Sequence, residues 1–383
     1  MSTELPGWLP MVDLQAQRRR LSGRIEAAIT RVLEHGQFIL GPEVAELEAA
    51  LARHVGVRHA IGCASGTDAL LLVLMAWGIG RGHAVLVPAF TFAATAEAVA
   101  LLGATPVLCD VDEATFCLDP SSLGRGIEMA RARADLEPRA VIPVDLFGQP
   151  ADYEAILPIA RAASLLVLQD AAQSFGARLH GIPAGRQGDA AAASFYPSKP
   201  LGAYGDGGAV LTDDDALAEE IRLLRAHGEP PGRRYQHLRV GVNSRLDTLQ
   251  AAILLAKLPA LEAELAARAM LAGRYDRALS SLVRVPELRP GVASAWAQYT
   301  IRTDRRDRLA ERLRERGSAS AVHYAEPLHR QPAWRDFPSA PGGLPVAEAL
   351  AARVLSLPMH ADLEEADQDR VIDAIRSALG ERP

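Results

Sequence analysis

Short apolar segments alternate with longer segments of helical pattern between residue 60 and about residue 215. Most of the short segments are apolar throughout rather than at every second position, as strands covered on both faces are. We therefore expect strands at residues 59–63, 84–87, 106–110, 140–144, 165–168, 191–195 and 209–212. Strands and helices in alternation, joined by short turns, predict a mainly parallel sheet between layers of helices.

Helical patterns precede and separate these strands. Residues 14–35 and 42–53 come first, and the second segment begins with Pro42 and carries the acids Glu43, Glu46 and Glu48, which is typical of a helix N-terminus. Further helices are expected at residues 66–77, 95–102 and 152–163.

The pattern changes after about residue 258. We expect a long, charged, alanine-rich helix at 261–279, an alternating segment at 296–302, a helix at 305–317, a loop rich in His and Pro at 323–332 and a last helix at 364–379. This order indicates a smaller α/β domain packed on the first. The expected fold class is α/β, with a large domain over residues 1–258 and a small C-terminal domain over residues 259–383.

Composition narrows the classes of function. The 383 residues suffice for two or three domains, and 49% hydrophobic with 23% charged residues is ordinary for a soluble protein. A net charge of −6 argues against a nucleic-acid partner. Cys63, Cys109 and Cys117 are too few for a disulfide framework and indicate core residues of a cytoplasmic protein. We expect no secretory signal, and the most apolar stretch, residues 69–80, is too short to span a membrane.

Lys199 and Asp170 are the clearest candidates for catalytic residues. Lys199 lies in a glycine-rich loop, and Pro200 keeps its backbone out of the helical region, so this lysine does not lie on a solvated helix face. Asp170 follows an apolar strand. A lysine amine can form a Schiff base with the aldehyde of pyridoxal phosphate, while a carboxylate keeps the pyridine nitrogen protonated. The plain alternatives are a surface lysine and an N-cap carboxylate for a helix beginning at Ala171.

Several neighbours could bind the rest of such a cofactor. Gly66 and Thr67 lead into an apolar helix, whose first free N–H groups can bind a phosphate; the alternative is an ordinary N-cap by Ser65 or Thr67. Ser194 offers a further hydroxyl to the phosphate. Phe92 follows a strand and either stacks on a planar ring or fills the core.

Three more polar residues are candidates. Gln173, close after Asp170, can reach a hydroxyl on the cofactor ring. Asn243 and Arg245 lie in an irregular segment just before an apolar helix. From the residues alone, this pair could simply cap that helix, so their function stays open.

Four motifs occur together and in a fixed order. They are Ser-Gly-Thr-Asp-Ala-Leu (65–70), Asp-Ala-Ala-Gln-Ser-Phe-Gly-Ala (170–177), Ser-Phe-Tyr-Pro-Ser-Lys (194–199) and Asn-Ser-Arg-Leu-Asp-Thr-Leu-Gln-Ala-Ala (243–252). In these motifs the chain resembles the sugar aminotransferases of the DegT/DnrJ/EryC1/StrS family. The resemblance extends from residues 38–44 to residues 355–359. It implies the fold-type I, aspartate aminotransferase-like architecture of pyridoxal phosphate enzymes.

The resemblance also implies a role for each candidate. Lys199 would bind the cofactor covalently, Asp170 would pair with the pyridine nitrogen, Gln173 would contact the ring hydroxyl and Phe92 would lie over the ring. The phosphate would be bound by Gly66, Thr67, Ser194 and Asn243, the last reaching in from the second subunit of a homodimer. His323 and Tyr324 would belong to the loop on the sugar side, where Ala325 replaces the usual proline.

The implied reaction is a ping-pong transamination from L-glutamate to a nucleotide-linked ketosugar. Family members with histidine in place of the lysine act as dehydratases, so Lys199 favours transamination. Residues 196–202, 239–250 and 297–300 are most similar to the subgroup that aminates C3 of UDP-2-acetamido-2-deoxy-3-oxo-D-glucuronate for bacterial surface polysaccharides. Arg245 would then bind the uronate carboxylate or the glutamate carboxylate. A dTDP-linked 3- or 4-keto-6-deoxyhexose is the alternative substrate, and a non-catalytic, pyridoxal phosphate-binding regulatory protein is the alternative of another class.

Overall fold

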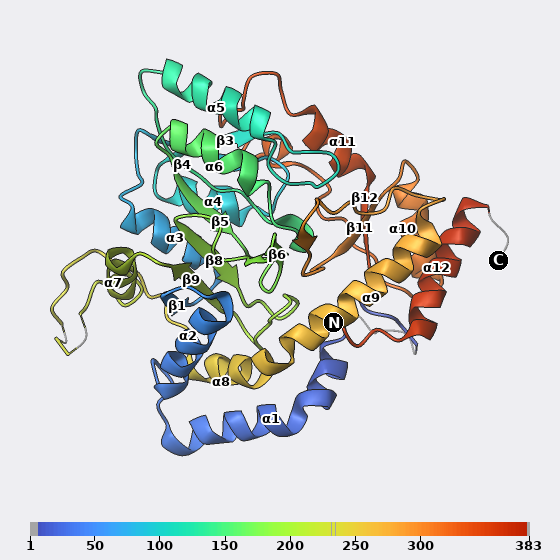
Figure 1. The fold of residues 1–383 in the computed structure, drawn as a ribbon, viewed down its shortest axis with the longest axis horizontal. Helices are drawn as coiled ribbons and strands as arrows, with labels where there is room; N and C mark the ends of the chain where they lie inside the picture. The colour runs from blue at the N-terminus through green and yellow to red at the C-terminus, as the bar shows by residue number, and fades with distance from the viewer. Residues whose placement is uncertain (1–6, 231, 234, 381–383) are drawn as a thin grey trace.

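The computed structural model describes residues 7–230, 232–233 and 235–380. Its centre is a seven-stranded sheet with helices on both faces (Figure 1). In spatial order the strands are β1 (His59–Cys63), β9 (Gly208–Thr212), β8 (Ala190–Ser194), β5 (Leu166–Asp170), β4 (Glu137–Val141), β2 (His83–Pro88) and β3 (Thr105–Cys109). All seven predicted strands are present, although the strand expected at 140–144 begins and ends three residues earlier.

One strand runs against the rest. β3, β2, β4, β5 and β8 pair in parallel, whereas β9 is antiparallel to both β8 and β1. The sheet is therefore mainly parallel, as predicted. Because β8 and β9 run in opposite directions, a single loop joins them at one end of the sheet, and this loop contains Lys199.

Helices cover the sheet on both faces. The first face packs against α3 (Gly66–Ala76), α4 (Ala94–Leu101) and α7 (Asp215–Leu224). On the opposite face, α5 (Pro120–Ala132) and α6 (Tyr153–Ala162) cover one half of the sheet. The other half packs against α2 (Pro42–Val55) and α8 (Thr248–Lys257), with α1 (Leu14–His35) outside α8. The strand residues alternate between these cores, which explains why the strands are apolar throughout.

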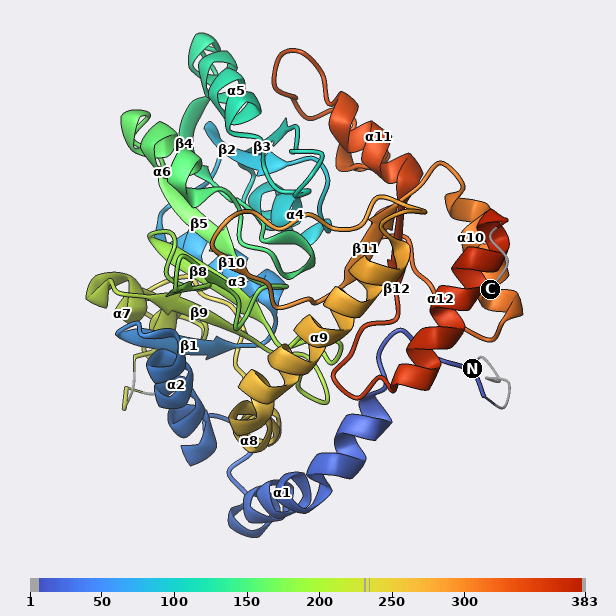
Figure 2. The same cartoon turned by 45° about the vertical axis from the view of Figure 1, so that its right-hand side comes forward.

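A second, smaller core lies beyond α9 (Leu261–Leu279), the long helix that crosses the molecule in Figures 1 and 2. Here a two-stranded sheet of β11 (Tyr299–Arg302) and β12 (Val354–Leu357) packs with α9, α10 (Arg306–Glu315) and α12 (Glu365–Leu379). Leu9, from the N-terminal segment, joins this core. Residues 328–354, which contain α11 (Pro345–Arg353), return to the core of the large sheet. The domain division at residue 258 stays a prediction.

The sequence pattern did not predict several of the elements. They are α5, α7, α11 and β12, the short strands β6 (Arg178–Leu179), β7 (Ile182–Pro183) and β10 (Val292–Ala293), and the 3₁₀ turns Leu146–Gly148, Leu258–Ala260 and Leu328–Arg330. α5 contains Gly124 and Gly126, which weaken a helical signal. The three cysteines are buried and unpaired, as expected of core residues. Within the part of the chain that the structure describes, no helix has both the length and the apolar character needed to cross a bilayer.

Candidate active site

A cavity of about 540 Å³ lies where the carboxyl ends of β5 and β8 meet the N-terminus of α3. This edge is where open α/β sheets bind ligands. Nine of the predicted site residues line the cavity: Gly66, Thr67, Phe92, Asp170, Gln173, Ser194, Lys199, His323 and Tyr324. Five segments far apart in the sequence thus converge on one space. Of the last two, His323 contacts Ser356 in β12 of the small core, whereas Tyr324 packs against the core of the large sheet.

Asp170 is the last residue of β5 and is 5% exposed. Its Oδ2 accepts a hydrogen bond from the Thr95 hydroxyl at 2.9 Å, and its Oδ1 accepts one from the backbone N–H of Ala172 at 3.2 Å. Burial raises the pKa of the carboxyl group above its usual value, although both hydrogen bonds and the Lys199 ammonium oppose that rise. No helix begins at Ala171: residues 171–177 form turns, so the N-cap interpretation of Asp170 is wrong.

Lys199 lies half-buried in the turn between β8 and β9, where its N–H donates to the carbonyl of Tyr196 at 2.9 Å. Burial lowers the pKa of its ammonium group, while the carboxylate of Asp170 raises it. Among the described residues, Nζ has no hydrogen-bond partner. A buried amine that tends to lose its proton is a good nucleophile for a carbonyl carbon.

The N-terminus of α3 forms one corner of the cavity. Ser65 is the N-cap, and its hydroxyl accepts from the N–H of Asp68 at 3.1 Å. Within the described chain, the N–H groups of Gly66 and Thr67 have no acceptor. A Cβ on Gly66 would lie 2.6 Å from the Cβ of Ser194, so only glycine lets α3 approach β8 this closely. The capping and anion-binding interpretations are compatible, because the cap leaves these two donors free.

Aromatic rings form one wall of the cavity. The Phe92 side chain is 57% exposed, and its ring centroid lies 6.2 Å from that of Tyr324. Phe92 is therefore not core filler. Gln173 lies beneath this wall: its Oε1 accepts from the N–H of Phe147 at 2.8 Å, and its Nε2 donates to the Tyr324 hydroxyl at 3.3 Å. An exposed ring above a buried carboxylate suits a planar heteroaromatic group with a basic nitrogen.

His323 is fixed from the small core. Its Nδ1 lies 2.9 Å from the hydroxyl of Ser356, which in turn contacts the Thr300 hydroxyl at 2.9 Å. Burial, and then the Lys199 ammonium, lower the pKa of His323. The imidazole is therefore neutral at pH 7 and can accept or donate one hydrogen bond in the cavity.

Asn243 and Arg245 do not line this cavity. Asn243 is exposed, and its backbone pairs with that of Ala226. The helix that follows is capped by Asp247, whose side chain accepts from the N–H of Gln250 at 2.8 Å, so the capping interpretation of the pair is wrong. The Nε of Arg245 is buried without a hydrogen-bond partner in the described chain.

Sequence reasoning missed Thr95 and Asp145. Thr95 reaches Asp170 from α4, 75 positions away, so no local motif reveals it. Asp145 is fully buried behind Asp170, and burial raises its pKa to about 6. Its carboxylate accepts from the Ser174 hydroxyl at 2.6 Å and from Gln169 Nε2 at 2.7 Å. These bonds anchor the turn that carries Gln173. Thr91, Tyr196, Asp206 and Gln298 also line the cavity and were not predicted as site residues.

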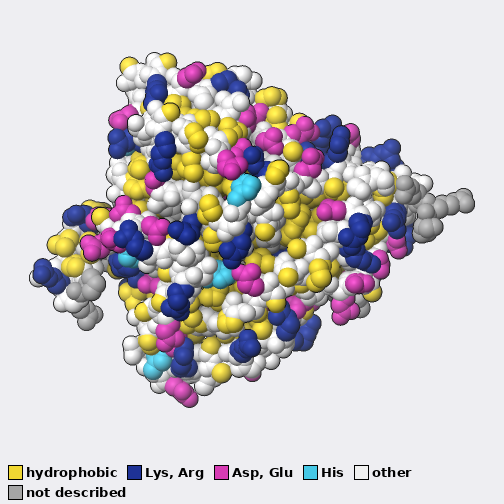
Figure 3. All heavy atoms as spheres, in the orientation of Figure 1, with side chains coloured by type: hydrophobic (Ala, Val, Ile, Leu, Met, Phe, Trp, Pro, Cys, Tyr) yellow, Lys and Arg dark blue, Asp and Glu magenta, His cyan; other side chains and the backbone are white. Residues whose placement is uncertain are grey.

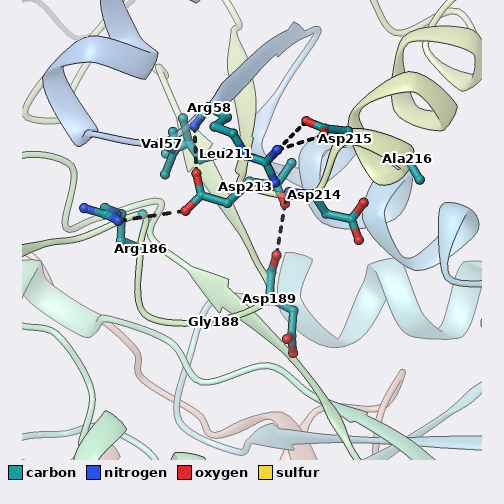
Figure 4. A pocket seen from close by; sticks show the side chains of 12 residues that line it. Val57, Arg58, Arg186, Gly188, Asp189, Leu211, Asp213, Asp214, Asp215 and Ala216 are labelled. Carbon is teal, nitrogen blue, oxygen red and sulfur yellow. Dashed lines mark hydrogen bonds and ion pairs between the residues drawn. The ribbon is translucent and has the colours of Figure 1, made fainter.

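A second hollow lies at the opposite edge of the sheet, near the start of β1 (Figure 4). Its acids serve the fold: Asp213 accepts from the N–H of Arg58 at 2.7 Å, Asp215 pairs with the Arg58 guanidinium, and Asp214 caps α7. We therefore assign it no chemistry. On the face drawn in Figure 3, basic and acidic side chains are interspersed.

Comparison with known proteins identifies the family. The model of the DegT/DnrJ/EryC1/StrS aminotransferase family matches residues 20–376. The chain belongs to this family. It is 49% identical over 361 residues to the UDP-2-acetamido-2-deoxy-3-oxo-D-glucuronate aminotransferase of Pseudomonas aeruginosa, with 94% of this chain and 97% of the relative covered. The family resemblance seen in the four motifs is thus confirmed.

Solved structures agree with the fold. A DegT DnrJ EryC1 StrS aminotransferase from Brucella abortus has a TM-score of 0.95 and 51% identity, with 97% of this chain and 99% of that chain covered. NtdA from Bacillus subtilis with bound cofactor PMP (pyridoxamine phosphate) has a TM-score of 0.87 and 28% identity, with 100% and 87% covered. The predicted α/β class and the aminotransferase architecture are confirmed.

Proposed function

We propose that this family member uses pyridoxal phosphate to transfer the amino group of L-glutamate to C3 of UDP-2-acetamido-2-deoxy-3-oxo-D-glucuronate. One observation carries the proposal: the same cavity is lined by a buried carboxylate and by an amine and two helix-terminal N–H groups that have no hydrogen-bond partner among the described residues. The similar enzyme of Pseudomonas aeruginosa, named for this sugar, supports the choice of substrate.

The lining residues fit the cofactor. Asp170 has a raised pKa because its buried charge lacks a strong partner, and a pyridine N–H would supply one. Gly66, Thr67 and Ser194 would bind the phosphate, Phe92 would cover the ring and Gln173 would contact its hydroxyl. When bound, the ring supplies an electron sink for the carbon that loses its proton.

Lys199 moves the proton in each half of the reaction. Burial lowers its pKa, which raises the fraction of neutral amine, and the neutral Nζ can take the proton from the carbon that carries the amino group. The same Nζ then returns a proton on the other side of the transferred nitrogen. Asp170 meanwhile holds a proton at the pyridine nitrogen, and Phe92 limits the access of water.

The sugar would bind on the side of His323 and Tyr324. Both residues line the cavity, and the neutral imidazole can form a hydrogen bond with a sugar hydroxyl. Arg245, whose Nε has no partner in the described chain, would bind the uronate or the glutamate carboxylate. Because Arg245 lies outside its own cavity, it would act, like Asn243, on the site of a second subunit.

A homodimer with shared sites completes this proposal. Two segments near the start of α8 expose apolar side chains: Phe38, Ile39 and Leu40 are exposed, and Ile39 bridges to Asp247. Leu238 and Val240 are exposed in the loop that follows α7, which extends from the body of the molecule in Figure 1. Large exposed apolar side chains of this kind are common at protein interfaces.

We place the enzyme in the cytoplasm, in a pathway that makes a bacterial surface polysaccharide. Three buried, unpaired cysteines fit a reducing compartment.

The test is incubation with nucleotide ketosugars and L-glutamate, followed by mass spectrometry. We expect amination of the UDP-3-oxo-uronate to exceed that of a dTDP-linked 3- or 4-keto-6-deoxyhexose by at least about 100-fold in kcat/KM, since Arg245 has a carboxylate to bind. A preference for the dTDP sugar would contradict the proposed substrate. A protein that stays yellow with every amino acid would support the regulatory alternative instead.

A further inference from the structure

The chain contains 39 arginines and only two lysines, Lys199 and Lys257. Arginine therefore occupies nearly every position where a positive charge suffices. Both lysines contact the same loop, the segment between β8 and β9: Lys199 belongs to it, and Lys257 reaches it from the end of α8. The proposed chemistry explains the first lysine but not the second.

Lys257 is 3% exposed, and its ammonium is bound to the loop at two points. Nζ donates a hydrogen bond to the carbonyl oxygen of Gly202 and lies 5.0 Å from the centroid of the Tyr204 ring. Burial lowers the pKa of this ammonium to about 8. A cation that is this costly to bury is retained for the contacts that it makes.

The segment held by Lys257 is coupled closely to Lys199. A Cβ on Gly202 would lie 2.3 Å from the carbonyl oxygen of Pro197, so the chain folds back tightly here. The N–H of Ala203 also donates to the carbonyl of Phe195 at 2.7 Å. Gly202 therefore cannot shift without displacing the turn that presents Lys199.

A second residue of α8 holds the loop further along. Gln250 accepts a hydrogen bond from the N–H of Tyr204 at 2.9 Å, and a Cβ on Gly205 would lie 3.2 Å from its amide. Gln250 and Lys257, both in α8, thus form hydrogen bonds with the same loop. Neither lines the cavity, so both act on it only through the loop.

We propose that Lys257 is a positioning residue that sets the place of Lys199 by fixing Gly202 and Tyr204. Its compact ammonium supplies a single point charge in a closed space, where the larger planar guanidinium of arginine would push the loop outward. This inference rests on the proposed function, in which Lys199 attacks the cofactor aldehyde.

The test compares two cofactor forms on the full-length chain after the cofactor has been removed. Pyridoxal phosphate must bond to Lys199, whereas PMP has no aldehyde and needs only the cavity. In Lys257→Met we expect a roughly 10- to 100-fold slower formation of the yellow, lysine-bound form, because the amine is misplaced. The dissociation constant of PMP should stay within about twofold of wild type, because the cavity walls are intact.

Three further variants serve as controls. Gln250→Leu should slow the bonding step in the same direction, and Lys257→Arg should not restore it. Tyr275→Phe removes a buried hydrogen bond from the small core, where the tyrosine hydroxyl donates to the carbonyl of Pro358 at 3.1 Å. It should lower the unfolding temperature without changing the bonding rate.

Bonding at the wild-type rate in Lys257→Met would overturn the inference. The inference would also be overturned if PMP affinity and the rate of bonding to Lys199 fell equally, because equal losses would indicate that the whole site is disrupted. If Lys257→Met does not fold, the same comparison on Gln250→Leu and Lys257→Arg decides. A wild-type chain that forms no bond at Lys199 would contradict the proposed function instead.

Discussion

Asp170 illustrates how a single residue of this site can lower the stability of the fold and still be needed for the reaction. Within the described part of the chain, its buried carboxylate accepts hydrogen bonds from only a threonine hydroxyl and one backbone N–H, and burial raises its pKa. Without a cofactor this charge destabilises the fold, and a protonated pyridine nitrogen would relieve the cost. Removing the charge should therefore raise the stability of the cofactor-free protein and lower the activity of the enzyme.

Asp170→Asn should stabilise the cofactor-free protein but disable the enzyme. The amide oxygen can accept from the N–H of Ala172 and the amide NH2 can donate to the Thr95 hydroxyl, so two hydrogen bonds are possible without the buried charge, and the unfolding temperature at pH 7 should rise. Turnover should fall by roughly 10²–10³-fold, since about 3–4 kcal/mol from a buried charge pair is lost. Thermal unfolding and steady-state kinetics measure the two effects. Equal or lower stability together with normal turnover would contradict the role of Asp170.

The same residue predicts a dependence of stability on pH. The folded pKa of Asp170 is raised, so the native state holds this proton more tightly than the unfolded chain, and its contribution to stability falls as pH rises between the two pKa values. In the absence of cofactor, the difference in unfolding temperature between Asp170→Asn and wild type should grow as pH rises from the unfolded-state pKa of this carboxyl group through its higher folded-state pKa. A constant difference would mean that burial does not perturb this carboxyl group.

At the residue scale, the sequence could predict chemistry that is written in local motifs. Lys199, Asp170 and Gly66 each stand in a short pattern, and all three line the cavity. Thr95 and Asp145 could not be predicted, because their partners are distant and a threonine in a helix is unremarkable. Asn243 was assigned by family resemblance alone, and its role remains a proposal.

At the scale of elements, the α3 N-terminus depends on close packing against β8. Gly66 has no room for a side chain because Ser194 lies in contact, and this approach brings a hydroxyl and two free N–H groups to one corner. An added methyl group should move the helix away from the strand and separate these donors.

Gly66→Ala should therefore weaken PMP binding. A helix N-terminus contributes up to about 2 kcal/mol to anion binding, so we expect a loss of roughly 30-fold, measured by titration. Gly124→Ala is the matched control: this glycine lies in α5 with no atom within 4 Å of the added Cβ. The control should stabilise the fold by about 0.5–1 kcal/mol and leave binding unchanged. Equal binding in both variants would exclude the α3 corner as the phosphate site.

The elements themselves were predictable where burial makes a segment uniformly apolar. Every strand of the large sheet was expected for this reason, whereas α5 and α7 were missed. α7 begins at the last of three consecutive aspartates (213–215), a run that indicates a loop although Asp214 caps the helix. The reversed direction of β9 leaves no trace in hydrophobicity, because antiparallel and parallel strands in a covered sheet are equally apolar.

At the scale of the whole molecule, the proposal requires two subunits for each complete site. Lys199→Ala and Asn243→Ala homodimers should both be almost inactive. In an equal mixture that exchanges subunits, about half of the dimers are mixed, and each mixed dimer has one intact site. The mixture should therefore recover about a quarter of wild-type activity. No recovery, with exchange verified by mass spectrometry, would mean that Asn243 acts within its own subunit.

The large-scale arrangement was only partly predictable. The change in pattern near residue 258 predicts a second domain, and the structure has a separate hydrophobic core around β11 and β12, while the domain division itself stays a prediction. That α11 packs on the large sheet and that Leu9 packs on the small core could not be foreseen. Both are contacts between segments far apart in the chain, which periodicity does not encode.

The most direct test of the account is borohydride fixation of pyridoxal phosphate on the reconstituted protein, followed by peptide mapping. With only two lysines, the outcome is simple to read. We expect a stable label on Lys199 in the wild-type chain and none in Lys199→Ala. A label on Lys257, or no label on a reconstituted chain, would contradict the assignment of the site.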